Sequence, residues 1–503
     1  MRKARNPILF FLIFTGTAGI LNAQLLRKNG FRLDSAASTS DSRIASGGIN
    51  DLICGGDSVW AAHGEGLSLS SDGGSSWKNI GRINGLGKGG VSAFAALDGI
   101  IWAATGYDTL TADAGNLPAG GGVGYSMDGG DSWHWTSQPK DSRTETRYSP
   151  TTTHIQNITY DLTLVPSTTD TTVWIASFGG GLRKSADRGK TWEVVTVDGT
   201  PFNPGKILSH RAFAVYFDGE ALWAGTAGGL HKSMDNGRTW TTFSHRNQTR
   251  GISGNFVVAI ARQKSRERDI VWAATVETTS ESNDSTEFRG VSKSEDGGLT
   301  WSTTLRGVFP HNCAFDDSAV YVAADSGLYK SLDYGETWAV FPPIRDRETD
   351  EPIYGIEMNC SAVGPGHVLW AGASDGLART DDDGNTWKVF RAFQTPGQAG
   401  QPATYAYPNP FSPFRDNLAG EDGHVRFQYK TRNPARVTVR VYDFGMNLVR
   451  NVTEGRERPV QGDYSEAWDG RNDFGDMSAN GVYFYRIDVS GEGPIWGKVI
   501  VMN

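Results

Sequence analysis

A short pattern, S/T-x-D-x-G-x-S/T-W, occurs seven times in the 503-residue sequence and constrains its fold more than any other feature. A carboxylate in a turn accepts hydrogen bonds from nearby backbone amides, and glycine supplies a positive φ. The closing tryptophan provides a large apolar anchor for the next strand. We call this pattern the aspartate motif and predict that each copy is a structural turn; the seven aspartates are Asp72, Asp128, Asp187, Asp235, Asp296, Asp333 and Asp382.

Two further elements recur upstream of each copy. A strand-like segment with an aromatic residue precedes each motif, and in the first unit it is Val59–Ala62. An apolar run comes before that segment in each unit, and in the second unit this run is Phe94–Leu97. A Gly-Leu or Gly-Val step, as at Gly327-Leu328, then leads into the motif. Each unit therefore contains four short strands, and four-stranded antiparallel units repeated around an axis are propeller blades. The sequence predicts an all-β fold with a seven-bladed β-propeller over residues 49–393.

The last hundred residues have a different pattern. After a polar linker at 394–404, hydrophobic and polar residues alternate with period two, as in Val437–Tyr442 and Gly481–Ile487, and turn residues separate the runs. This pattern is typical of a small β-sandwich, which we expect over residues 405–503.

The amino terminus has the features of a secretory signal peptide over residues 1–23. Three basic residues precede the apolar stretch Ile8–Phe14, and small residues lead to a cleavage point after Ala23. We expect no membrane span once it is removed. The segment 24–48 either adds a strand that closes the ring or is disordered. Removal of the signal takes away three of 48 basic residues and none of 56 acidic ones, which argues against nucleic acid as a partner.

The repeats resemble the Asp-box (BNR) propeller superfamily, which includes sialidases, xyloglucanases, sortilin-type receptors and photosystem II assembly factors. The resemblance covers residues 49–392 and implies that the seven motifs are structural. The Tyr407–Phe411 start (YPNPF), the Trp468-Asp469-Gly470 motif and the final strand are similar to Ig-like domains of flagellar hook-capping proteins. They are also similar to C-terminal sorting domains of the bacterial type IX secretion system. This implies export or surface attachment through the secretion machinery, or else a structural Ig-like appendage.

Long connections indicate where a ligand would bind. In a propeller, the loops between the second and third strands and the loops between blades emerge on the face opposite the aspartate motifs. All the long insertions belong to that opposite face: 107–122, 137–156, 197–210, 276–288 and 342–353. The predicted ligand-binding residues are Tyr107, Asp108, Arg143, Glu145, Arg147, Tyr148 and Arg211. We also expect a polar ring at the channel mouth, made by Asn50, Ser92, Asn157, Arg211, Asn255 and Asn312.

No catalytic set is recognisable. Thirteen of 16 tryptophans belong to the motifs or the aromatic strands, and only Trp135, Trp468 and Trp496 remain. The nearest analogue of the sialidase Arg-Ile-Pro motif, Phe31–Asp34, lacks the proline. His154, His210 and His311 lie in different blades, so we predict neither a metal nor a cofactor.

Three cysteines do not form a disulfide framework. We expect Cys54, Cys313 and Cys360 to be small buried residues, with a Cys54–Cys360 bridge as the alternative. The sequence thus predicts a secreted or cell-surface bacterial protein, monomeric, that binds a protein or glycan through the face with long loops. A sialidase-like or other glycan-active hydrolase is the alternative, and an envelope component without a ligand is a third possibility.

Overall fold

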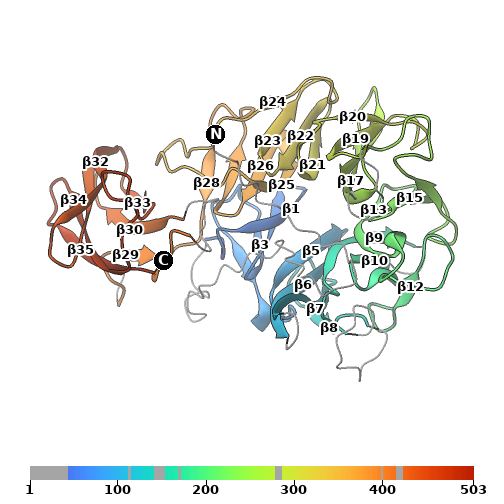
Figure 1. Ribbon diagram of the computed structural model, residues 1–503, viewed down its shortest axis with the longest axis horizontal. Coiled ribbons are helices and arrows are strands. Elements are labelled where there is room, and N and C mark those ends of the chain that lie inside the picture. The colour runs from blue at the N-terminus through green and yellow to red at the C-terminus, as the bar shows by residue number, and fades with distance from the viewer. Residues whose placement is uncertain are drawn as a thin grey trace.

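The computed structural model describes residues 43–111, 115–140, 153–167, 171–277, 286–397, 400–414 and 423–502, and the predicted signal peptide lies outside them. Regular structure in these ranges is almost entirely β (Figure 1). Three short 3-10 turns, η2 (Arg82–Asn84), η3 (Leu208–His210) and η4 (Pro365–His367), are the only helical segments described. Across the same ranges, the structure has no helix with the length and apolar character needed to cross a membrane.

Seven four-stranded antiparallel sheets fill the described residues from 49 to 390, and each sheet consists of four strands that are consecutive in sequence. Sheets 1 to 4 are β1 (Ile49–Gly55), β2 (Ser58–His63), β3 (Gly66–Ser70), β4 (Lys78–Ile80); β5 (Gly90–Leu97), β6 (Ile100–Thr111), β7 (Gly115–Ser126), β8 (His134–Thr136); β9 (Thr159–Pro166), β10 (Thr171–Ser177), β11 (Gly181–Ser185), β12 (Glu193–Val195); and β13 (Ala212–Phe217), β14 (Leu222–Thr226), β15 (Gly229–Ser233), β16 (Thr241–Phe243). Sheets 5 to 7 are β17 (Phe256–Lys264), β18 (Asp269–Val276), β19 (Gly290–Ser294), β20 (Ser302–Thr304); β21 (Pro310–Asp316), β22 (Ala319–Ala324), β23 (Gly327–Ser331), β24 (Ala339–Val340); and β25 (Met358–Gly364), β26 (Val368–Ala373), β27 (Gly376–Thr380), β28 (Lys388–Phe390).

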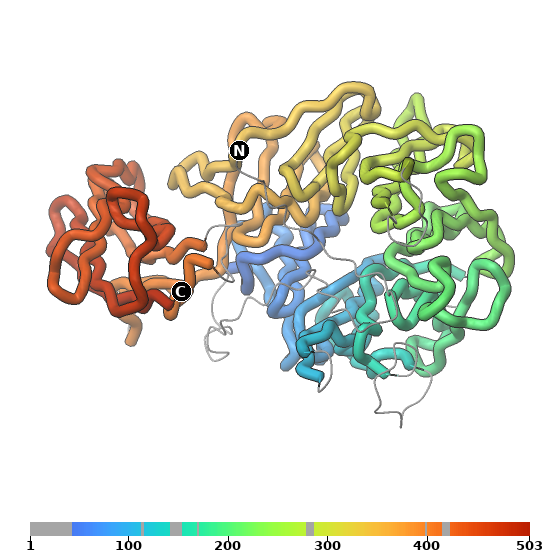
Figure 2. The backbone as a smooth tube through the Cα atoms, viewed as in Figure 1, coloured from blue at the N-terminus to red at the C-terminus, as the bar shows by residue number. Residues whose placement is uncertain are grey.

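The first strands of the sheets pack against one another in chain order, and β1 also packs against β25, so the sheets form a closed cycle (Figures 1 and 2). At the closing contact, Asn359 Nδ2 donates to the Ile49 carbonyl at 2.7 Å. Trp77 meets Trp370 edge to face with ring centroids 6.2 Å apart. The described residues 43–48 contribute no strand, and each sheet is complete within its own repeat. This arrangement agrees with the predicted propeller-type fold.

The aromatic second strands form the centre of the core. Trp174, Trp223 and Trp272 are almost completely buried because the neighbouring sheets cover both faces of these strands. The glycine of each aspartate motif makes this packing possible. A Cβ at Gly237 would lie 2.3 Å from Trp174 of the preceding sheet, and one at Gly130 would lie 2.7 Å from Trp60. The motif glycine therefore lets a turn of one sheet contact an aromatic ring of the sheet before it.

Each aspartate motif connects the third and fourth strands of its sheet. In the first copy, the Ser76 amide and hydroxyl donate to the two carboxylate oxygens of Asp72 at 2.8 and 2.6 Å. Ser70 Oγ donates to Asp72 at 2.8 Å and accepts from the Gly74 amide, where φ is +90°. The same four hydrogen bonds recur in the other six copies. The carboxylate thus closes the turn from within.

The C-terminal module, residues 405–502, contains two sheets around a separate core. One sheet has the order β29 (Tyr405–Tyr407), β30 (Val425–Thr431), β33 (Gly462–Trp468), and the other has the order β32 (Leu448–Arg458), β31 (Ala435–Tyr442), β34 (Gly481–Val489), β35 (Ile495–Val501). Phe427, Trp468 and Tyr485 are fully buried between the sheets. Alternate residues of β31 and β34 point into this core, as the period-two pattern predicts.

The module packs against sheet 7 (Figure 2). Arg426 of β30 donates to Asp375, in the turn between β26 and β27, at 2.7 Å, and both side chains are at most 5% exposed. Glu351 accepts from Ser465 Oγ of β33 at 3.1 Å and pairs with Arg391 at 3.0 Å. The insertion 342–353, which we predicted to lie on the ligand-binding face, is therefore engaged by the module through Glu351.

Candidate functional site

Sheet 2 differs from the other sheets by an extended hairpin. Its middle strands, β6 and β7, have 12 residues each, whereas β2 and β3 of sheet 1 have six and five. The extra residues continue the antiparallel ladder, with Tyr107 opposite Ala119 and Thr111 opposite Gly115. The predicted insertion 107–122 is thus largely a projecting β-hairpin (Figure 1).

Two other segments pack against this hairpin. The Gly120 amide donates to the His154 carbonyl at 2.8 Å, and the Gln156 amide donates to the Pro118 carbonyl at 2.7 Å. From the connection between sheets 1 and 2, the Lys88 amide donates to the Gly121 carbonyl at 3.4 Å. A Cβ at Gly121 would lie 1.9 Å from the Lys88 carbonyl oxygen, so this approach requires glycine. The Gly120–Gly122 run therefore brings three segments together.

Polar and aromatic side chains converge where these segments meet. Lys88 Nζ lies 3.7 Å from the centroid of the Tyr107 ring, and the Tyr107 and His154 rings stack with centroids 6.2 Å apart. Lys140 is near enough to His154 to influence its titration. Neither Lys88 nor Lys140 forms an ion pair with a carboxylate of the described residues. We call Lys88, Tyr107, Lys140 and His154 the hairpin cluster.

The electrostatics of the hairpin cluster favour an anion. Burial lowers the pKa of His154, and the positive charges of Lys140 and Lys88 lower it further. Burial also raises the pKa of Tyr107 above its ordinary range. The cluster then offers two lysine charges and two neutral hydrogen-bonding groups, on a chain whose formal net charge is −8. Such a set of donors can bind a carboxylate, sulfate or phosphate.

The structure describes three of the seven predicted ligand-binding residues, and each lies in a different place. Tyr107 is in the hairpin cluster. Asp108 is the next residue on the hairpin and is exposed. Because successive strand residues point to opposite faces, Asp108 lies on the face opposite to that of Tyr107. Arg211 is 4% exposed, and its Nε donates to the Pro204 carbonyl at 2.7 Å, which favours a structural role. The other four, Arg143, Glu145, Arg147 and Tyr148, lie outside the described residues.

The residues predicted to form a polar ring at the channel mouth lie at the starts of the inner strands, and several contact neighbouring strands. Asn50 and Asn312 donate to the Val91 and Ser361 carbonyls of the next inner strands, at 2.9 and 2.8 Å. Close in sequence to two of the predicted positions, Arg211 and Asn255, an aromatic cluster includes Phe213 and Phe256, whose ring centroids lie 4.3 Å apart. Every inner strand has a β-bulge near its start, and a bulge shifts the alternation of side chains. The sequence pattern did not predict these bulges.

Sequence reasoning missed two carboxylates on the inner strands. Burial raises the pKa of Asp51 on β1 to about 7 and that of Asp161 on β9 to about 8. Asp161 accepts from the Val215 amide of the next sheet at 2.9 Å, which ties sheets 3 and 4 together. A comparison of the repeats could have indicated them, because Asp51 and Asp161 occupy the position just after the bulge, where sheet 2 has Ala93.

In the part of the chain described, the cysteines form no disulfide, and neither they nor the histidines form a metal site. Cys54, Cys313 and Cys360 are free thiols, although Cys54 and Cys360 share one apolar cluster. Burial raises the pKa of Cys54 to about 12, so the thiol stays protonated. No group of three or more His, Cys, Asp or Glu side chains there is arranged to hold a metal ion.

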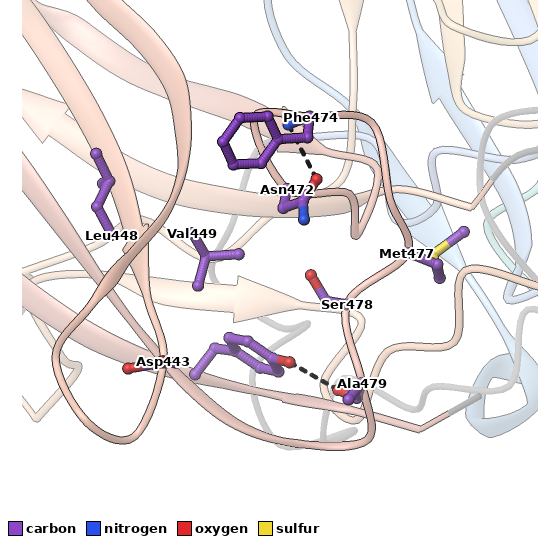
Figure 3. Close-up of a pocket in the computed structure, with 9 residues that line it drawn as sticks. Asp443, Leu448, Val449, Asn472, Phe474, Met477, Ser478 and Ala479 are labelled. Atoms are coloured by element: carbon purple, nitrogen blue, oxygen red, sulfur yellow. Dashed lines mark hydrogen bonds between the residues drawn. The ribbon is translucent and has the colours of Figure 1, made fainter.

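A cavity of about 300 Å³ opens at one end of the C-terminal module (Figure 3). Leu448, Val449 and Met477 line it, and the neighbouring Phe474 is 92% exposed. Its acidic group, Asp443, already accepts hydrogen bonds from Asn447. The lining thus combines apolar side chains with polar groups, and its carboxylate is already hydrogen-bonded.

Comparisons with known proteins identify no family for this chain. No family model and no curated protein match the sequence. Among solved structures, PorZ, a bacterial surface component of the type-IX secretion system of Porphyromonas gingivalis, is 17% identical with a TM-score of 0.32, covering 89% of this chain and 64% of that one. An ancestral GH74 enzyme is 15% identical with a TM-score of 0.48, covering 90% and 62%. The extracellular domain of a one-component system from B. thetaiotaomicron is 13% identical with a TM-score of 0.28, covering 90% and 69%. The chain thus spans less than two thirds of the first two proteins.

Proposed function

We propose that this chain is a secreted or cell-surface protein that binds a protein or glycan without catalysing a reaction. The binding face would consist of the extended hairpin of sheet 2 and the two segments that pack against it. The observation that carries the proposal is the hairpin cluster, in which Lys88 and His154 flank the Tyr107 ring. Three segments from different parts of the repeat converge there, and none of the four side chains belongs to the repeated core pattern. Long connections held on a rigid scaffold are a common location for binding sites.

The proposal includes an architecture. The seven sheets would be the blades of a seven-bladed Asp-box propeller at 49–393, and the cyclic contacts of the first strands support this. The module at 405–503 would be Ig-like and serve export or attachment; its two sheets around one core support the sandwich. The proposal also includes a signal peptide at 1–23, a linker at 394–404, a monomeric state and the secretion machinery as partner.

The binding function can be tested with single variants of the full chain. Wild-type protein, Tyr107→Ala and Lys88→Ala are compared on a glycan array and in pulldowns from the surface fraction of the source bacterium, with Lys190→Ala as control. Lys190 is an exposed lysine in the aspartate-motif turn of sheet 3, outside the long insertions. We expect both cluster variants to lose a ligand that the control retains. Equal binding by all four proteins would contradict the assignment of the site.

A glycan-active hydrolase is the second candidate, and the two buried carboxyls with raised pKa values, Asp51 and Asp161, are the residues that test it. Turnover of a panel of sialosides and plant polysaccharides is the measurement. Hydrolysis that is abolished in Asp51→Asn and Asp161→Asn would replace the binding function with this one. We expect no turnover.

A further inference from the structure

Trp135 is an exposed tryptophan next to the hairpin cluster. It lies on β8, the outer strand of sheet 2, and is 49% exposed, whereas the tryptophans of the second strands are buried. Its Nε1 donates to the Gly121 carbonyl at 3.1 Å. The Lys88 amide donates to the same carbonyl at 3.4 Å. One carbonyl therefore connects the exposed indole to the segment that carries Lys88.

That carbonyl is available because Gly121 is a bulged residue. Thr105 pairs with Gly122 and Gly106 pairs with Gly120, so that Gly121 has no partner in the ladder. β-Bulges are frequent next to functional sites, where they redirect a side chain or a backbone group. Here the bulge directs a carbonyl toward two donors from outside the hairpin.

Glycines hold the indole in a fixed orientation. A Cβ at Gly87 would lie 2.6 Å from Trp135 Nε1, and one at Gly122 would lie 2.2 Å from the same atom. The indole edge thus packs directly on backbone, and its N–H is already satisfied. The side chain is 49% exposed while its hydrogen-bonding group is turned inward.

A rigid exposed ring and nearby cations suit one class of ligand. A ring face packs on the C–H face of a pyranose through dispersion and burial of apolar surface. Lys88 and Lys140 have no carboxylate partner among the described side chains and would pair with an anionic substituent. A neutral sugar would leave both lysines unpaired, and an acidic peptide would have no use for the flat ring.

We infer that Trp135, Lys88, Lys140, Tyr107 and His154 bind an acidic saccharide, with Trp135 stacking on a sugar ring and the lysines pairing with its carboxylate or sulfate groups. The inference rests on the proposed function, because it names the ligand class of the same face. Carboxylate and sulfate are the two sources of the negative charge, and the experiment separates them.

The test measures the affinity of the full chain for three oligosaccharides of equal length: an oligouronate, a sulfated galactan and a neutral galactan. We expect at least one acidic ligand to bind and the neutral one not to bind, with affinity that falls as salt screens the charges. Lys88→Ala, Lys140→Ala and Trp135→Ala should each weaken binding about tenfold, as loss of one ion pair or one stacking contact predicts. A larger response to the uronate or to the sulfate identifies the anion.

Matched variants separate stacking from structure. Trp135→Phe keeps a ring but lacks the N–H that donates to Gly121, so substantial binding by this variant supports stacking, and binding as weak as that of Trp135→Ala contradicts it. Trp496→Ala, which removes a 45% exposed tryptophan of the C-terminal module, should bind like wild type. Circular dichroism of every variant checks that the sheets are intact.

Three outcomes would overturn the inference: equal affinity for the neutral galactan, competition by an acidic peptide as strong as that by the acidic saccharide, or no effect of the Trp135 and lysine substitutions. If the acidic saccharides fail while another glycan or a protein is still lost on Tyr107→Ala, the ligand class is wrong and the proposed function stands. If no ligand depends on Tyr107 or Lys88, both are wrong.

Discussion

At the scale of single residues, the aspartate motif shows how a short pattern determines a local structure. Hydrogen bonds from the Thr191 hydroxyl and amide hold the pKa of Asp187 at about 2, below the ordinary 3.8, because they stabilise the ionised carboxylate. The bonds are local, spanning four residues or fewer, so the sequence alone is sufficient to predict them. The turn therefore forms in the same way wherever the pattern occurs.

We predict that Asp187→Asn lowers the free energy of unfolding at pH 7 by about 1 kcal/mol, since an amide cannot replace both acceptor oxygens. The pKa of Asp187 is depressed in the folded state, so its contribution is complete above pH 3.8 and is lost as the pH falls toward about 2. Urea unfolding at several pH values measures the difference, which should shrink across that window. Asp57→Asn, on an exposed turn, is the control. A deficit that does not depend on pH would contradict the carboxylate's role.

At the scale of elements, the extended hairpin distinguishes sheet 2 from the rest of the repeat. Its length, its bulge at Gly121 and its contacts with the Lys88 and His154 segments produce the candidate site. The hairpin is thus the part of sheet 2 that departs from the repeat and forms the candidate site.

Gly121→Ala should disrupt this arrangement. The added Cβ would lie 1.9 Å from the Lys88 carbonyl oxygen and 2.5 Å from Thr105 Oγ1, which forces the Lys88 segment to move. Over-packing of this kind costs about 1–3 kcal/mol. We expect a lower unfolding temperature and higher Trp135 exposure, seen as a red-shifted fluorescence. Gly55→Ala, where a Cβ meets nothing within 4 Å, should have neither effect. Unchanged fluorescence in Gly121→Ala would show that the bulge does not position the indole.

Local elements were predictable from the sequence, and their long-range partners were not. The all-β class and the four-stranded antiparallel sheets follow from the repeat, because strand order within a sheet is the order in the chain. Tyr107 was selected for its place in an insertion. Lys88, Lys140 and His154 were not selected, because their proximity depends on pairings such as Pro118 with Gln156, which no local pattern encodes. The bulges likewise hid Asp51 and Asp161.

At the scale of the whole molecule, the contact between sheet 7 and the C-terminal module is polar and buried. Asp375 pairs with Arg426 and Arg391 and accepts from the Tyr354 amide, while its side chain is 1% exposed. A buried charge that loses its partner is strongly destabilising, so this contact couples the stability of the two parts.

Asp375→Ala should therefore cost about 3–5 kcal/mol, because it leaves two arginines without this carboxylate. Differential scanning calorimetry of the full chain measures it, and the module should separate as an earlier transition. Glu457→Ala breaks the Arg436–Glu457 pair, whose side chains are 72% and 73% exposed, and should cost less than about 1 kcal/mol. Equal effects of the two substitutions would mean that the Asp375 pair does not hold the parts together.

The buried contact at Asp375 has a consequence for proteolysis. A single cut in the proposed linker at 394–404 would break the covalent connection but leave Arg426, Ser465 and their partners in place. The two fragments would then migrate together on a native gel and come apart only in denaturant. Nicking alone would not release the larger fragment from a surface to which the smaller one was tethered.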